Sequence, residues 1–253
     1  MTGGTPDSAF WIRLWRSRRP MRTPSRSRSP DCGRTGAKRS LVTRSAALAE
    51  PVFGHLYETE LLPSGAELDP DRYENLAIEG EFAIRLACDV PDAHWLRTHR
   101  GEAIATVFPV IELHNYVFRR TPHTAAELIA NNGLHAGVVL PRDEMALARI
   151  YSPSGEPVSV LRNGELLGTA TGETLPDFPF GSLIRLAGHL ERTGRQLLRD
   201  QLVLIGSPLP LYPVSEGDAI DVRCPGWALE VSARVCRPVA ARNSGAGASR
   251  RNE

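Results

Sequence analysis

Two strand-like stretches constrain this chain more than any other feature. Residues 77–87 read AIEGEFAIRLA, and residues 105–118 read ATVFPVIELHNYVF. Because side chains alternate between the two faces of a strand, Glu79 and Glu81 are neighbours on one face, while the other face is apolar. Like charges this close repel each other unless a cation or a proton joins them. Taken alone, the pair also fits an ordinary half-exposed strand with its polar side in water.

Glu112 adds a second constraint. It lies in the stretch 105–118 with apolar residues on both strand faces, so we expect it to be buried. A buried carboxylate must be protonated, paired with an arginine or bound to a metal. Three carboxylates on two strands suit a hard cation, Mg²⁺ or Mn²⁺ rather than Zn²⁺. From the residues alone, a metal site and a buried ion pair with Arg85 or Arg119 explain Glu112 equally well.

Several short motifs surround these glutamates in a fixed order. They are FGHL at 53–56, EGE at 79–81, PVIE at 109–112, ANNG at 130–133, NGE at 163–165, LVLIGS at 202–207 and PVSEGD at 213–218. Together they resemble the fumarylacetoacetate hydrolase superfamily, in particular its branch of 2-keto-4-pentenoate hydratases and 4-oxalocrotonate decarboxylases. The resemblance covers roughly residues 51–235.

The resemblance implies both a fold and a metal centre. Many expected strands and few short helices indicate a mixed, predominantly β (α+β) domain, and the resemblance makes it a fumarylacetoacetate hydrolase-like β-roll. It implies that Glu79, Glu81 and Glu112 are the ligands of Mg²⁺ or Mn²⁺.

The resemblance also suggests acid/base residues. Lys38 is the only lysine of the chain; it matches a G-x-K motif whose lysine is a proposed acid/base group, although a solvated lysine explains it as well. Glu58 stands where the branch often has an aspartate near the substrate. His114 replaces part of the branch's V-D-S-R run and is either a general base near neutral pH or a packed histidine.

Three further residues are candidate substrate ligands. Gly206 and Ser207 follow a buried strand, where backbone N–H groups and a hydroxyl can bind a carboxylate, although Gly-Ser-Pro is also an ordinary turn. Asn132 lies in the segment that resembles the family's A-D-N-x motif.

The resemblance implies a lyase: a divalent-metal-dependent hydratase acting on a 2-hydroxy-2,4-dienoate or 2-oxo-enoic acid through a metal-stabilised enolate. The alternatives are a 2-oxo acid decarboxylase of the 4-oxalocrotonate type, a C–C hydrolase, and a catalytically weakened homologue that only binds a 2-oxo acid. A His–Glu pair near the metal would favour the hydrolase. We also expect a homo-oligomer.

Composition divides the chain into three parts. Residues 1–46 are rich in arginine, with the Arg-Ser-Pro alternation typical of disorder. A basic segment like this can bind nucleic acid or anionic lipid. We expect it instead to be an unstructured extension without a nucleic-acid partner. Residues 47–237 form the expected catalytic domain, and residues 238–253 a disordered tail.

The cellular location of the protein is predicted from targeting, membrane-spanning and cysteine features of the sequence. The apolar run 10–15 is too short for a signal-peptide core or a membrane span, and no other run is long enough to span a bilayer. None of the four cysteines has C-x-x-C spacing, which argues against a zinc site and a disulfide framework. We therefore expect a cytoplasmic protein without a membrane partner.

Overall fold

The structure is a computed structural model that describes residues 13–14, 53–118, 124–149 and 152–238. Lys38, almost all of the basic segment 1–46 and residues 239–253 lie outside the described residues. The expectations placed on them stay predictions.

Strands predominate over helices in the described residues, as the α+β expectation requires. The strands are β1 (Arg13–Leu14), β2 (Gly54–His55), β3 (Leu61–Pro63), β4 (Ala66–Leu68), β5 (Leu76–Leu86), β6 (Ile104–Asn115), β7 (His135–Leu140), β8 (Met145–Ala146), β9 (Pro157–Arg162), β10 (Glu165–Thr171), β11 (Leu202–Gly206), β12 (Tyr212–Pro213), β13 (Ala219–Cys224) and β14 (Leu229–Val235). The helices are α1 (Ala93–Thr98), α2 (Arg100–Ala103), α3 (Ala125–Ala130) and α4 (Phe180–Glu191), with short 3-10 turns that include η1 (Glu58–Glu60) and η3 (Asn132–Leu134).

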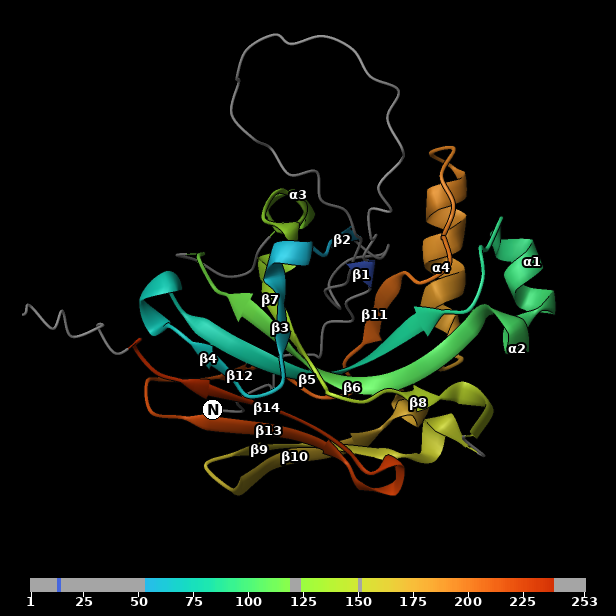
Figure 1. Cartoon of the computed structure of the whole chain (residues 1–253). Helices are drawn as coiled ribbons and strands as arrows, with labels where there is room; N and C mark the ends of the chain where they lie inside the picture. Colours follow the sequence, from blue (N-terminus) through green and yellow to red (C-terminus); the bar gives the residue numbers. More distant parts are fainter. Residues whose placement is uncertain (1–12, 15–52, 119–123, 150–151, 239–253) are drawn as a thin grey trace, which may run out of the picture.

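The described strands form two sheets. The larger has the order β2-β1-β11-β5-β6-β7-β3, with β12 added beside β5 and β8 beside β6; the smaller has the order β10-β9-β13-β14-β4. Strands β5 and β6 pair antiparallel over almost their whole length. In Figure 1 these two long strands curve through the middle of the molecule, and the smaller sheet lies beneath them.

The main core fills the space between the two sheets. Ile78, Phe82 and Ile84 of β5 are fully buried, and they share a face with Gly80. A Cβ on Gly80 would lie only 2.4 Å from Cγ2 of Val160, in the smaller sheet. The sheets therefore meet closely behind the E-G-E motif, and alternation directs both glutamates to the opposite face.

Helices α1, α2 and α4 lie together at one end of the larger sheet (Figure 1). Helix α4 buries an apolar stripe of Leu183, Leu186, Ala187 and Leu190, as its helical period predicts. It packs beside α1. Thr124 caps α3 in a capping box with Glu127, also as predicted.

The sequence predicts strands over 150–159 and 160–169, with tight turns at Ser154-Gly155 and Asn163-Gly164. The first turn is confirmed as the 3-10 turn Pro153–Gly155. The strand boundary at Ser159 was wrong, because β9 runs unbroken from Pro157 to Arg162. The hairpin turn at Asn163-Gly164 is confirmed, because both residues adopt the positive φ that such turns need.

Two smaller expectations concern cysteines and membranes. The strand-like surroundings of Cys88, Cys224 and Cys236 predict small apolar core residues. This is confirmed for Cys224, which is buried, and wrong for Cys88 and Cys236, which are half-buried; these three are free thiols. Among the described residues, no helix combines the length and the apolar character needed to cross a bilayer.

Candidate metal and catalytic site

Four ionisable side chains lie buried together on the face of the larger sheet that points away from the smaller one. In the β5–β6 register Glu79 stands opposite Glu112, and Ala77 stands opposite His114. Glu79 is 1% exposed, and Glu81, Glu112 and His114 are fully buried. The burial expected of Glu112 is confirmed, and it extends to both glutamates of β5.

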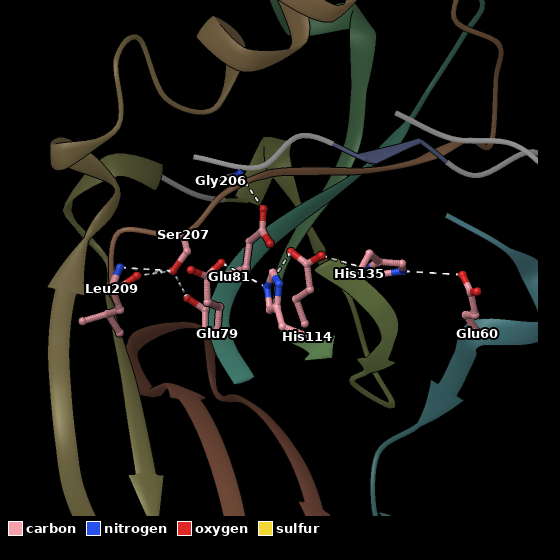
Figure 2. Close-up of polar contacts among 10 residues, drawn as sticks. Glu60, Glu79, Glu81, His114, His135, Gly206, Ser207 and Leu209 are labelled. Atoms are coloured by element: carbon pink, nitrogen blue, oxygen red, sulfur yellow. Dashed lines mark hydrogen bonds and ion pairs between the residues drawn. The ribbon is translucent and has the colours of Figure 1, made fainter. Parts of the chain in front are cut away.

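Three of these side chains form a compact cluster. One ligand atom each from Glu79, Glu112 and His114 lies within 4.8 Å of the other two, an arrangement able to hold a metal ion. Nε2 of His114 is 3.4 Å from Oε2 of Glu79 and 3.6 Å from Oε2 of Glu112. Figure 2 shows the imidazole of His114 facing the carboxylates.

The two carboxylates change the acidity of His114. Burial alone lowers the pKa of an imidazole, but the charges of Glu112 and Glu79 and their hydrogen bonds outweigh this and raise the pKa of His114 to about 9. Without a metal, the His114 imidazolium therefore balances part of the carboxylate charge at neutral pH.

Glu81 shares the same face but has another contact. Its Oε1 accepts a hydrogen bond of 2.8 Å from the backbone N–H of Gly206, at the end of β11 (Figure 2). Ser207, next in the chain, donates its hydroxyl to the carbonyl oxygens of Gly80 and Leu209. The Gly206-Ser207 turn thus adjoins the site and binds a carboxylate of the chain itself, and the role of both residues toward a substrate stays a prediction.

A second histidine extends the site. Nδ1 of His135, on β7, lies 2.7 Å from Oε1 of Glu112, and its Nε2 lies 3.6 Å from Oε2 of Glu60. Figure 2 shows this line of side chains running from the cluster to Glu60. Since a carboxylate only accepts, Nδ1 of His135 donates, and this fixes the orientation of the ring.

An irregularity in the sheet positions His135. The β6–β7 register shifts after Leu113, so that His135 stands opposite His114. Such a bulge re-aims side chains and is common beside active sites. Gly137 follows with φ of 147°, and a Cβ there would lie 3.1 Å from the carbonyl oxygen of Glu60. Glycine at this position lets η1 approach β7.

The arginine suggested as the partner of Glu112 pairs elsewhere. Nη2 of Arg85 lies 2.5 Å from Oε1 of Glu144, and Thr106 donates a 2.6 Å hydrogen bond to the same carboxylate. A buried pair between Glu112 and Arg85 is therefore wrong. Arg119, the other suggested partner, lies outside the described residues.

Glu58 and Asn132 are not directed at the cluster in the way their motifs suggest. Glu58 is exposed on η1, whereas Glu60, two residues later, is the acid that faces His135. The Asn132 side chain accepts from the N–H of His55 at 2.5 Å and donates to its carbonyl at 2.8 Å. Asn132 thus fixes strand β2, and its role toward a substrate stays a prediction.

A pocket of about 300 Å³ opens on the outer side of His135. Its lining includes Glu60, Arg72, Tyr73, Asn115 and His135. This volume is at the lower end of the range of small-molecule sites. Arg72 and Glu60 place one charge of each sign on its wall.

Sequence reasoning missed both His135 and Glu60. His135 begins a strand, where a polar residue is unremarkable, and the bulge that turns it inward leaves no signal in hydrophobic periodicity. Glu60 lies in a short segment with two neighbouring acidic or polar residues, and only the fold selects it.

Comparisons with known proteins agree on one group of relatives. The chain is 25% identical over 185 residues to the TodF product hydratase of Pseudomonas putida, covering 73% of this chain and 69% of that protein. It is 23% identical over 185 residues to 2-keto-4-pentenoate hydratase 1 of Dechloromonas aromatica, covering 73% and 70%. No protein-family model matches the chain.

A solved structure shares the fold. The 4-oxalocrotonate decarboxylase from Pseudomonas putida G7, complexed with magnesium and adipate, superposes with a TM-score of 0.67 at 21% identity, over 74% of this chain and 71% of that one. At this identity the likeness establishes the fold, including its mixed sheets and few short helices.

Proposed function

We propose that this chain, a relative of the 2-keto-4-pentenoate hydratases with the fold of the fumarylacetoacetate hydrolase superfamily, is a divalent-metal-dependent hydratase of a 2-hydroxy-2,4-dienoate. The observation that carries the proposal is the buried cluster of Glu79, Glu112 and His114. Buried carboxylates this close together need a compensating positive charge.

The donor set fits a divalent ion. Carboxylate oxygens bind Mg²⁺ and Mn²⁺, and an imidazole nitrogen is also a common ligand of divalent metals. Glu79, Glu112 and His114 would hold the ion, with Glu81 beside them on the same face. When bound, the ion would supply Lewis-acid stabilisation of the negative charge that develops on a 2-oxo acid.

The protein's own residues would bind the acid and move its protons. Arg72, on the wall of the pocket beside His135, would pair with the carboxylate of the acid. Because Nδ1 of His135 donates to Glu112, Nε2 of the neutral ring is left to exchange a proton. Glu60 stabilises the protonated ring from the other side. His135 Nε2 is thus the proposed proton carrier for ketonisation of the dienol and for addition of water across the conjugated double bond.

A C–C hydrolase is the second candidate, and one observation favours it. The His135–Glu60 pair beside the cluster is the kind of pair that activates water. The same residues would then deprotonate a water molecule that attacks a ketone carbon, and the broken bond would release two shorter acids.

The test uses the full chain with 2-hydroxypenta-2,4-dienoate, prepared in situ, in the presence of Mg²⁺ or Mn²⁺. A hydratase removes the ultraviolet band of the diene and gives a product heavier by one water molecule. EDTA should abolish the reaction. A persistent band with either ion, together with cleavage of an acylpyruvate into two acids, would replace the hydratase by the hydrolase.

A further inference from the structure

The geometry points to His114 as a metal ligand that completes the donor set in place of a third carboxylate, so that the site prefers Mn²⁺ and later transition metals to Mg²⁺. This inference rests on the proposed function, since it concerns the ion which that function requires. It departs from the three-glutamate site that the sequence resemblance implies.

The position of His114 is the first support. It lies on β6 two residues after Glu112, and alternation puts both side chains on one face. The register places Glu79 opposite Glu112, so His114 is diagonal to Glu79. All three side chains are buried, and the cluster combines two carboxylates with one imidazole.

The distances are the second support. Two donors about 2.1 Å from a shared ion lie about 3.0–3.4 Å apart at octahedral or tetrahedral angles. The separations from His114 Nε2 to the carboxylate oxygens are 3.4 and 3.6 Å, close to this spacing. One ring nitrogen therefore faces an oxygen of each carboxylate at nearly the distance that donors around one ion have.

The orientation of Glu81 is the third support. Its Oε1 accepts from the Gly206 N–H at 2.8 Å, and Glu81 does not join the cluster in the described part of the chain. Gly206 lies at the end of β11. The next residue, Ser207, donates its hydroxyl to the carbonyl oxygen of Gly80, and this positions the Gly206 amide. The hydrogen bond therefore turns Oε1 of Glu81 toward β11, and the compact group is formed by His114 with Glu79 and Glu112.

His135 supports the same assignment from outside. Its Nδ1 donates to Oε1 of Glu112, while Oε2 of Glu112 faces His114. A hydrogen bond to the far oxygen of a carboxylate orients the near oxygen toward a metal. Glu112 therefore presents a defined oxygen to the cluster.

The donor set determines which metals bind. A site of carboxylates alone suits Mg²⁺ and Ca²⁺, whereas an imidazole adds affinity for transition metals, which rises along the series from Mn²⁺ to Cu²⁺. We expect the wild-type protein to bind Mn²⁺ at least about tenfold more tightly than Mg²⁺.

The experiment measures metal binding without turnover. The full chain, labelled with ¹⁵N-histidine and freed of metal with EDTA, is titrated with Mg²⁺ and Mn²⁺ by calorimetry. Electron spin-echo spectra of the Mn²⁺ complex then report a directly bound imidazole nitrogen. The expected result is tight Mn²⁺ binding with ¹⁵N coupling in the wild type, a measurement that needs no variant.

Three variants identify the histidine whose nitrogen couples to Mn²⁺. His114→Asp should remove the coupling and reduce the preference for Mn²⁺ over Mg²⁺ by at least about tenfold, since it restores a third carboxylate. Glu81→Gln should keep the coupling. His94→Ala, which removes an exposed histidine, is the control. Circular dichroism verifies that each variant is folded.

The contrary outcomes are distinct. Bound Mn²⁺ without nitrogen coupling, and binding lost in Glu81→Gln, would restore the three-glutamate site and leave the proposed function standing. Coupling that persists in His114→Asp would assign the ligand to another histidine and overturn the inference. No binding of either ion by the wild type would overturn both the inference and the metal-dependent function.

Discussion

At the scale of single residues, the site is a problem of buried charge. Glu79, Glu81 and Glu112 are nearly inaccessible to water, and each has polar contacts that tolerate a negative charge there. The carboxylate of Glu112 is the most constrained, with His135 at one oxygen and His114 near the other. Substitutions at Glu112 can therefore distinguish the contributions of its shape, its hydrogen bond to His135 and its charge.

Two substitutions of Glu112 make this separation. Glu112→Gln keeps the shape and an oxygen that can accept from His135, but it removes the charge, so the metal-dependent rise in Tm should disappear. Glu112→Ala should also lose that rise, and it leaves the buried N–H of His135 unsatisfied at a cost of about 1–3 kcal/mol. Melting curves of the metal-free proteins and of the same proteins with Mn²⁺ measure both effects. If Mn²⁺ raised the Tm of Glu112→Gln as much as that of the wild type, Glu112 would not be a metal ligand.

His114 predicts how the metal-free protein responds to pH. Its pKa is raised to about 9 in the folded state from 6.5. The protonated His114 ring therefore stabilises the folded state fully below pH about 6.5, and this contribution to the free energy of unfolding is lost as pH rises through about 9. Its size is of the order of 3 kcal/mol.

Urea denaturation in EDTA from pH 6 to 10 checks this dependence. The free energy of unfolding should fall across that window in the wild type, and the part due to His114 should be absent in His114→Asn. An identical pH dependence of the two proteins would show that His114 is neutral between the carboxylates.

At the scale of elements, paired strands and one bulge bring the groups together. The sequence predicts the long strands and the shared face of Glu79 and Glu81, because alternation is a local property. It does not predict the bulge after Leu113, which depends on how β6 pairs with β7. For that reason His114 was foreseen as a candidate, and His135 with Glu60 was not.

The η1 turn provides a test of this assignment. Glu60→Gln should reduce turnover by about 10²-fold or more if Glu60 supports proton transfer at His135, while Mn²⁺ affinity changes little. Glu67→Gln, an exposed acid on β4, is the matched control. Impaired turnover in Glu58→Gln together with full activity in Glu60→Gln would return the role to Glu58, as the motif suggests.

At the scale of the whole molecule, two sheets support the site from behind. The fold class was predictable from the density of strand-like segments and from the motif order, and the α+β architecture confirms it. The packing of the sheets was not, since it depends on contacts between distant residues such as Gly80 and Val160. Because side chains alternate between the faces of β5, the face of Gly80 that packs on the smaller sheet leaves Glu79 and Glu81 on the opposite face.

Gly80→Ala tests the close approach of the sheets. The added methyl would overlap Val160 at 2.4 Å, so we expect a loss of about 1–3 kcal/mol in unfolding free energy. The second change Val160→Ala should recover part of this loss. Gly101→Ala, where a Cβ meets nothing within 4 Å, is the control, and urea denaturation compares the four proteins. Equal stability of Gly80→Ala and wild type would mean that the sheets are not held at this distance.

The most direct measurement is a crystal structure of the full chain soaked with Mn²⁺ and oxalate, a mimic of a 2-oxo acid, with anomalous data collected to locate manganese. We expect one manganese peak bonded to Glu79, Glu112 and His114, with oxalate beside it. A site that stays free of manganese under saturating Mn²⁺, with the His114 ring bonded directly to both carboxylates, would contradict it.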